Sequence, residues 1–354
     1  MKHTEKKFFG LNFARRFKFL IVMLIALASL FGGASFLASG KSNISRTASA
    51  VGETYQITYN TDGGDSIADD SYISSASQQT ITLATPTKSG YVFGGYTITT
   101  QTFGSNSSIS SKTTLTIPAN AYGDIVVKAT WIGYVDFSSS QSFSIRSSYK
   151  RWNGTIYYST DLSTWSTFGT TAINAVETDG TYHIYMYGTN NTRVSATSSS
   201  AHTSWAITGT ASSVSLTGDI EDLRDTFRAT SNKKMIANCY DYMFSGCTKL
   251  TSAPTLSAET LTDYCYRRMF AGCTGLTTAP ALQATSLAAG CYQSMFSGCT
   301  GLTTAPALQA TSLADSCYQS MFSGCTGLTT APTLPATTMT TSCYQSMFSG
   351  CTGL

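Results

Sequence analysis

The chain has 354 residues, which is enough for two to four domains of about 100 to 200 residues each. Charged residues make up only 12%, against a typical share of about 25%. The net charge is +3, but eight basic residues and one acidic residue precede residue 51, leaving 14 basic and 18 acidic residues after it. No basic run is left to displace counterions, so a nucleic-acid partner is excluded.

The first fifty residues have the layout of a signal peptide. A basic stretch is followed by an apolar run from Phe19 to Leu37 and by the small-residue site Ala48-Ser49-Ala50, which predicts cleavage after Ala50. The alternative is an uncleaved anchor, because the apolar run approaches the ~20 residues that span a bilayer. In both cases the remainder is exported. We expect an extracellular, cell-surface protein that meets the membrane only through this leader or through an unseen C-terminal anchor.

Residues 51–132 alternate apolar and polar side chains in short runs separated by turns such as Asp62-Gly63-Gly64, which predicts a small β domain. Three segments resemble the internalin-type B repeat, also called the Listeria-Bacteroides repeat: 57–64, 86–96 and 128–131. Tyr96 stands where that family usually has Trp. The resemblance implies a β-grasp-like spacer module of the kind found in bacterial surface proteins.

Residues 133–217 continue the alternation, as in Tyr182-His183-Ile184-Tyr185-Met186-Tyr187, and predict a second, β-sandwich-like domain. The run from Ser159 to Trp165 is similar to the Asp-box turn of sialidases, but its Trp comes one residue early. We interpret it as a hairpin turn held by a packed Trp.

From residue 218 a repeat dominates the chain. Two series of cysteines recur every 26 residues, at 239, 265, 291, 317 and 343 and at 247, 273, 299, 325 and 351. A fixed period in the twenties predicts a leucine-rich-repeat solenoid, in which each repeat buries its apolar side chains against its neighbours. We expect Phe270, Cys273, Leu276 and their equivalents to point inward.

Within each repeat we expect a strand near Leu276 to Ala279 and a short helical turn across Cys265 to Phe270. The segment Phe270-Ala271-Gly272-Cys273-Thr274-Gly275-Leu276 resembles the BspA-like leucine-rich repeats of bacterial surface proteins, and the resemblance implies adhesion or host contact. The fold class expected overall is mainly β with an α/β repeat region over 218–354. Since the sequence stops in mid-repeat, we expect the repeats to continue beyond Leu354.

The ten cysteines leave two readings open. Disulfides form outside the cell, yet Cys is also a small residue suited to a buried ladder. The aligned tyrosines, Tyr266 and its equivalents, are interpreted as internal packing, with an exposed contact stripe as the alternative. The eight-residue spacing between the two cysteine series and the lack of His in the repeats argue against a metal site.

These features predict a surface adhesion or recognition protein without cofactors that binds an extracellular protein or glycan. The alternatives are a structural spacer or surface-coat component with no specific ligand, and a secreted hydrolase, for which no catalytic motif is found. The candidate ligand-binding residues are Thr277, Thr278, Gln283, Thr303, Thr304, Gln309, Thr329 and Thr330.

Overall fold

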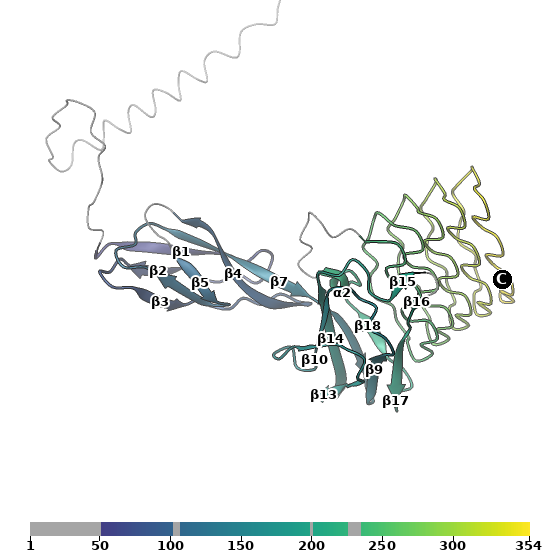
Figure 1. The fold of residues 1–354 in the computed structure, drawn as a ribbon, viewed down its shortest axis with the longest axis horizontal. Coiled ribbons are helices and arrows are strands. Elements are labelled where there is room, and N and C mark those ends of the chain that lie inside the picture. The colour runs from purple at the N-terminus through teal and green to yellow at the C-terminus, as the bar shows by residue number, and fades with distance from the viewer. Residues whose placement is uncertain (1–50, 102–106, 199–200, 226–234) are drawn as a thin grey trace, which may run out of the picture. The chain divides into compact units, whose positions relative to one another are not determined.

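The computed structural model describes residues 51–101, 107–198, 201–225 and 235–354; the predicted signal peptide lies outside them. The described chain is mainly β, with several mostly antiparallel sheets and one short helix, α2 (Asp222–Asp225) (Figure 1). Among the described residues, no helix has the length and apolar character of a membrane span.

The first module is built from two sheets on one core. Its strands are β1 (Thr54–Asn60), β2 (Asp70–Ile73), β3 (Gln79–Thr82), β4 (Tyr91–Gln101), β5 (Ser108–Ser111), β6 (Thr114–Ile117) and β7 (Ile125–Gly133). One sheet has the order β2-β1-β7-β4, with β1 and β7 parallel, and the other has the order β3-β6-β5. Ile57 and Val127 of the first sheet pack in one cluster with Leu115 and Ile117 of the second.

The expected β-grasp-like architecture is therefore not what the module shows. A β-grasp packs a helix on its sheet, whereas the described residues of 51–132 contain no helix. The second sheet covers the core instead. Its strand β6 alternates in burial, with Leu115 and Ile117 fully buried and the threonines between and before them half-buried, which is the period of a strand and not of a helix.

The second module is also two-sheeted. Its strands are β8 (Val135–Ser139), β9 (Phe143–Ser147), β10 (Thr155–Ser159), β11 (Ser166–Thr167), β12 (Ile173–Asn174), β13 (Val176–Thr178), β14 (Thr181–Thr189), β15 (Ala196–Ser198), β16 (Ala201–His202), β17 (Trp205–Gly209) and β18 (Ser215–Thr217). The larger sheet has the order β11-β10-β14-β8-β18, with β13 also on β14, and the smaller has the order β12-β9-β17. Phe137 and Ile184 from one and Ile145 and Trp205 from the other share a core.

The predicted leucine-rich-repeat solenoid is wrong. Residues 239–354, called the repeat region below, contain neither a helix nor a strand, and no solenoid or closed sheet forms among the described residues. Figure 1 draws the repeat region as successive loops without arrows or coiled ribbons. The strand expected near Leu276 to Ala279 is reduced to an isolated parallel bridge between Thr278 and Thr304, and the expected helical turn is a run of turns.

Backbone geometry explains why no helix forms. Within the turn segment of each repeat, three residues spaced four apart have a left-handed φ, as at Tyr264 (56°), Arg268 (53°) and Gly272 (74°), which an α-helix of L-residues cannot accommodate. Between them, Cys265 N–H donates to the Thr262 carbonyl three residues back (3.2 Å). The amides thus never settle into the i to i−4 pattern of an α-helix.

The remaining amides bond from one repeat to the next. Tyr266 N–H donates to the Cys291 carbonyl (3.0 Å), and Phe270 N–H donates to the Met295 carbonyl (3.0 Å). The same bonds recur one repeat later from Tyr292 to Cys317 (3.0 Å). Local and inter-repeat bonds therefore alternate along each turn segment, and the repeats stack in register.

Stacked side chains fill the interior of the repeat region. Phe270, Cys273 and Leu276 are fully buried, as their spacing predicts. The tyrosine rings of successive repeats stack with centroids 5.4 to 5.9 Å apart, and the phenylalanine rings stack at 5.7 to 5.8 Å. The tyrosine stripe is thus internal packing, and the alternative of an exposed contact stripe is wrong.

The second module and the repeat region share one hydrophobic cluster. Trp205 of β17 packs its ring against Phe244 with centroids 6.2 Å apart, and its backbone N–H donates to the Met243 carbonyl (2.7 Å). Val214 N–H, just before β18, donates to the Lys249 carbonyl (2.8 Å). The first repeat is therefore covered by the strands that precede it in sequence.

We expect Gly301→Ala to destabilise the repeat region by about 1–3 kcal/mol, the usual cost of overpacking. A Cβ at Gly301 would lie 2.5 Å from the Thr274 carbonyl oxygen of the preceding repeat, so the two repeats would have to separate. The control is Thr300→Ala at the adjacent exposed position, which should stay within about 0.5 kcal/mol. Urea unfolding of the full chain measures both, and equal midpoints would contradict the close approach.

Candidate functional site

The six predicted threonines lie on one exposed surface of the repeat region. Thr277 and Thr278 follow the buried Leu276, and the equivalent pairs follow Leu302 and Leu328. All six are exposed: Thr277, Thr278, Thr303, Thr304, Thr329 and Thr330. The two residues after each inward leucine are thus both exposed, in three successive repeats. We call these six residues the threonine column.

Backbone contacts hold the threonine column in register. Parallel bridges join Thr278 to Thr304 and Thr304 to Thr330. Thr329 N–H donates to the Thr303 carbonyl (3.3 Å), and the Thr329 hydroxyl donates to the same oxygen (3.4 Å). The column therefore presents hydroxyls and methyls at a fixed interval of one repeat.

The predicted glutamines lie further along the same extended segments. Gln283 and Gln309 are both exposed, each between two buried residues. Ser286 and Ser312, three residues beyond, are joined by a parallel bridge. The two amides therefore stand one repeat apart at the same position of adjacent segments.

The cysteines are free thiols, which removes the disulfide alternative. From Cys273 onward, each thiol of the second series donates to a phenylalanine carbonyl of the preceding repeat, as Cys273 does to Phe244 (3.0 Å) and Cys299 to Phe270 (3.1 Å). Cys247, in the first repeat, donates to the Trp205 carbonyl of the second module (2.8 Å). Burial raises the pKa of Cys247 and of Cys325 to about 12. Nucleophilic cysteines need a lowered pKa, so these thiols are packing groups.

The Asp-box-like turn holds a tryptophan, as its sequence predicts. Asp161 Oδ1 accepts from the N–H groups of Ser163 (2.8 Å) and Thr164 (2.9 Å), and these bonds lower the pKa of the Asp161 carboxyl. Trp165 then packs its ring against Tyr187 with centroids 4.6 Å apart. No group of three or more His, Cys, Asp or Glu suited to a metal ion occurs among the described residues.

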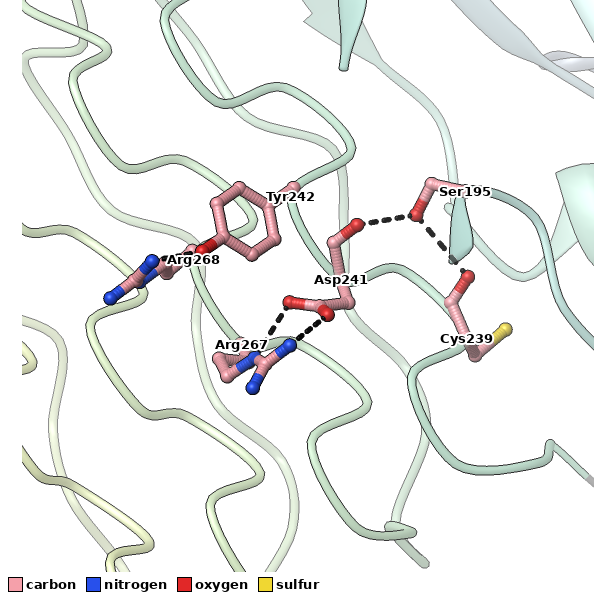
Figure 2. Close-up of polar contacts among 6 residues, drawn as sticks. All are labelled: Ser195, Cys239, Asp241, Tyr242, Arg267 and Arg268. Carbon is pink, nitrogen blue, oxygen red and sulfur yellow. Dashed lines mark hydrogen bonds and ion pairs between the residues drawn. The ribbon is translucent and has the colours of Figure 1, made fainter. Parts of the chain in front are cut away.

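A second polar cluster, which the sequence analysis missed, lies where the second module meets the first two repeats (Figure 2). Arg267 forms a two-pronged ion pair with Asp241, through Nε at 3.0 Å and Nη2 at 2.5 Å. Ser195 donates its hydroxyl to the Asp241 carbonyl (2.9 Å). Asp241 is fully buried, so its charge depends on Arg267.

The exposed rim of this cluster is aromatic and cationic. Arg268 lies over the Tyr242 ring at 5.1 Å and donates to the Tyr242 hydroxyl. His202 stacks against the Tyr242 ring, with centroids 3.6 Å apart. Figure 2 shows Arg268 and Tyr242 side by side on neighbouring repeats.

A departure from the repeat is the signal that could have found this cluster. Asp241 and Arg267 occupy the position filled by glutamine in the later repeats, and Arg268 occupies the position of Ser294. The glutamines bond to one another, as Gln319 does to Gln345 (2.7 Å). An ion pair at a repeat position that is otherwise glutamine therefore distinguishes the first two repeats, which lie at the junction, from the later ones.

Comparison with known proteins gives no relative: no family model, no curated protein and no solved structure matches the chain.

Proposed function

We propose that the protein is an exported bacterial cell-surface adhesion or recognition protein that binds an extracellular protein or glycan through the threonine column. The observation that carries the proposal is the exposure of all six predicted threonines at one-repeat intervals. A surface whose chemistry recurs in register favours a ligand that is itself repetitive.

The leader and the two sequence resemblances support the cell-surface assignment. A signal peptide over 1–50 places the remainder outside the cell. The B-repeat-like residues of the first module and the BspA-like motif around Cys273 are both similar to parts of surface proteins. Neither resemblance names a ligand, so the ligand class rests on the surface chemistry.

Multivalency gives the repeats a physical role in binding. A single exposed threonine contributes little affinity, but linked sites that engage one ligand together gain avidity without any new type of contact. The column supplies short side chains, which lose little rotamer entropy when they are ordered. Binding by this surface requires no catalytic group, and we propose no enzymatic activity.

We expect a triple variant, Thr278→Lys/Thr304→Lys/Thr330→Lys, to lose at least tenfold in affinity for the ligand, about 1.4 kcal/mol. The substitutions put bulk and charge along the column without touching the core. The control, Thr274→Lys/Thr300→Lys/Thr326→Lys, makes the same charge change at exposed positions outside the column and should bind as the wild type does.

The measurement is retention of the full chain on arrays of extracellular matrix proteins and glycans, followed by titration with the retained ligand. Equal loss in both triple variants would contradict a role for the column. Retention of the wild type by no ligand on either array would favour the alternative of a spacer without a specific ligand.

A further inference from the structure

The outer face of the larger sheet of the second module is the strongest unassigned surface. Along β14, Ile184 and Met186 are buried in the core, so His183, Tyr185 and Tyr187 point to the opposite face. Residues directly opposite each other on neighbouring strands share a face. The outer face therefore also carries the partners of these three residues: Tyr157, Ser159, Asp136, Ser138 and Val176.

Two groups of packed aromatic rings lie on this face. Tyr187 stacks on Tyr157 with centroids 5.0 Å apart, and Tyr185 lies between His183 (5.1 Å) and Tyr134 (5.3 Å). Tyr157, Tyr185 and Tyr134 are half-buried, so part of each ring remains accessible. Such rings offer flat apolar area at low conformational-entropy cost and carry hydroxyls at their rims.

The turn around Asp161 positions Trp165 at one end of these aromatic rings. Trp165 packs edge to face against Tyr187 and is itself half-buried. Asp161 fixes the turn before it through two backbone N–H groups. Trp165 is thus a positioned ring and not a mobile loop residue.

A polar pair lies among the rings. The Asp136 carboxylate lies 3.0 Å from His183 Nδ1, and the Asp136 and His183 side chains are 20% and 19% exposed. Asp136 is also the cross-strand partner of Tyr185. A carboxylate and an imidazole are therefore available to a ligand whose apolar face rests on the rings.

The face is joined to the repeat region at a position equivalent to the threonine column. Ser138 on β8 is paired with Ser215 on β18, and the Ser215 and Ser252 hydroxyls hydrogen-bond at 2.7 Å. Ser252 lies one repeat before Thr278 in the sequence. The hydroxyl side chains of Ser138, Ser215 and Ser252 are thus followed, at the same repeat position, by the threonines of the column.

The charges on this surface select the ligand class. Asp136 is the only carboxylate among the outer-face residues named above, and none of them is Lys or Arg. An anionic polymer would find no cation there. A neutral sugar chain fits, because the C–H faces of its rings stack on aromatic side chains while its hydroxyls bond to carboxylate, imidazole and hydroxyl groups.

We propose that this outer face binds a neutral polysaccharide, with the aromatic cluster as its anchor and the threonine column as its continuation. This rests on the proposed function, because it names the ligand class of the same extended surface. The aromatic cluster supplies the main affinity, and the column adds contacts only for a chain long enough to reach it.

Trp165→Ala and Tyr185→Ala test the proposal in the full chain. The probes are soluble unbranched glucan, mannan and xylan, with a sulfated polysaccharide for comparison, in affinity electrophoresis and in calorimetry with oligosaccharides of increasing length. We expect retardation by at least one neutral polymer, affinity that rises with chain length, and a loss of at least tenfold in each variant. The control is Tyr149→Ala, which removes a 60% exposed ring beside the other sheet and should change affinity less than twofold.

Asp136→Asn serves if an aromatic variant fails to fold, since it keeps the side-chain size and should weaken the same polymer several-fold. Retardation that is unchanged by Trp165→Ala, Tyr185→Ala and Asp136→Asn would overturn the proposal. If no neutral polymer slows the protein but a protein ligand binds through the threonine column, the polysaccharide proposal fails and the proposed function stands. If nothing binds, both fail.

Discussion

Raising the pH from 8 to 10 in the presence of a reducing agent is expected to unfold the repeat region. Burial raises the pKa of Cys247 and of Cys325 to about 12, and it also raises the pKa of Cys273 and of Cys299. In the unfolded chain these thiols ionise near pH 8.5. Above that pH the unfolded state releases protons that the folded state keeps.

The sign and size of the effect follow from proton linkage. A group whose pKa is raised by folding contributes stability that is fully present below its unfolded pKa and is lost as the pH rises towards its folded pKa. Each such thiol removes about 1.4 kcal/mol of stability per pH unit. Summed from pH 8.5 to 10, the loss from three or four such thiols reaches the whole free energy of unfolding of a typical domain, about 5–15 kcal/mol.

The hydrogen bonds of the thiols strengthen the expectation. Cys325 donates to the Phe296 carbonyl at 3.0 Å, so a thiolate there would face a carbonyl oxygen with no proton between them. Ionisation therefore breaks an inter-repeat contact as well as placing a charge in the core.

A Cys299→Ala/Cys325→Ala variant isolates the thiol contribution. It should be less stable at pH 7 but should lose about 2.7 kcal/mol less per pH unit than the wild type, since two titrating groups are gone. Leu302→Ala, at a fully buried position whose side chain has no ionisable group, should lower stability and leave the change of stability per pH unit as in the wild type. Urea unfolding at pH 7, 8, 9 and 10 measures the slopes, and parallel slopes for all three proteins would contradict the assignment.

Arg267→Gln is expected to destabilise the junction between the second module and the repeats by about 3–5 kcal/mol. The substitution leaves the fully buried Asp241 carboxylate without its two-pronged partner. An uncompensated charge in the interior costs more than the pair contributes. Thermal unfolding of the full chain gives the loss.

The double variant Asp241→Gln/Arg267→Gln should recover most of that loss. It places glutamine at the two positions where the later repeats carry Gln319 and Gln345, which bond to one another. Arg268→Ser, which also removes a cation but from an exposed position, is the control and should cost less than about 1 kcal/mol. A double variant as unstable as the single one would show that the pair has no coupling energy.

Periodicity made the interior of the repeats predictable. The 26-residue spacing is consistent with one side-chain position always facing the same way, so Phe270, Cys273 and Leu276 could be assigned to the core. Thr277 and Thr278 were expected at solvent-facing strand positions, and both are exposed. The structure leaves these threonines exposed, and their role in binding stays a proposal.

The junction cluster and the aromatic face were not predictable in the same way. Asp241 and Arg267 are separated by one repeat in sequence, and they become partners only when the repeats stack. The aromatic face combines Tyr157, Tyr187 and Trp165 through pairing of β10 with β14 and through the Asp161 turn. Register between strands distant in sequence is set by their shared core and not by either strand alone.

The sequence by itself determined the repeat length and the inward positions of Phe270, Cys273 and Leu276, because these depend only on regular spacing. Tertiary structure alone decided the backbone of each repeat. A left-handed residue costs roughly 1–2 kcal/mol, and the local sequence of Arg268 or Ser320 gives no reason to accept it. The cost is offset by inter-repeat hydrogen bonds, such as those of Arg268 with Gln293 and Phe270 with Met295, at about 1 kcal/mol each. Those bonds exist only once two repeats lie together, so a helix that looks acceptable within one repeat loses to turns shared between repeats.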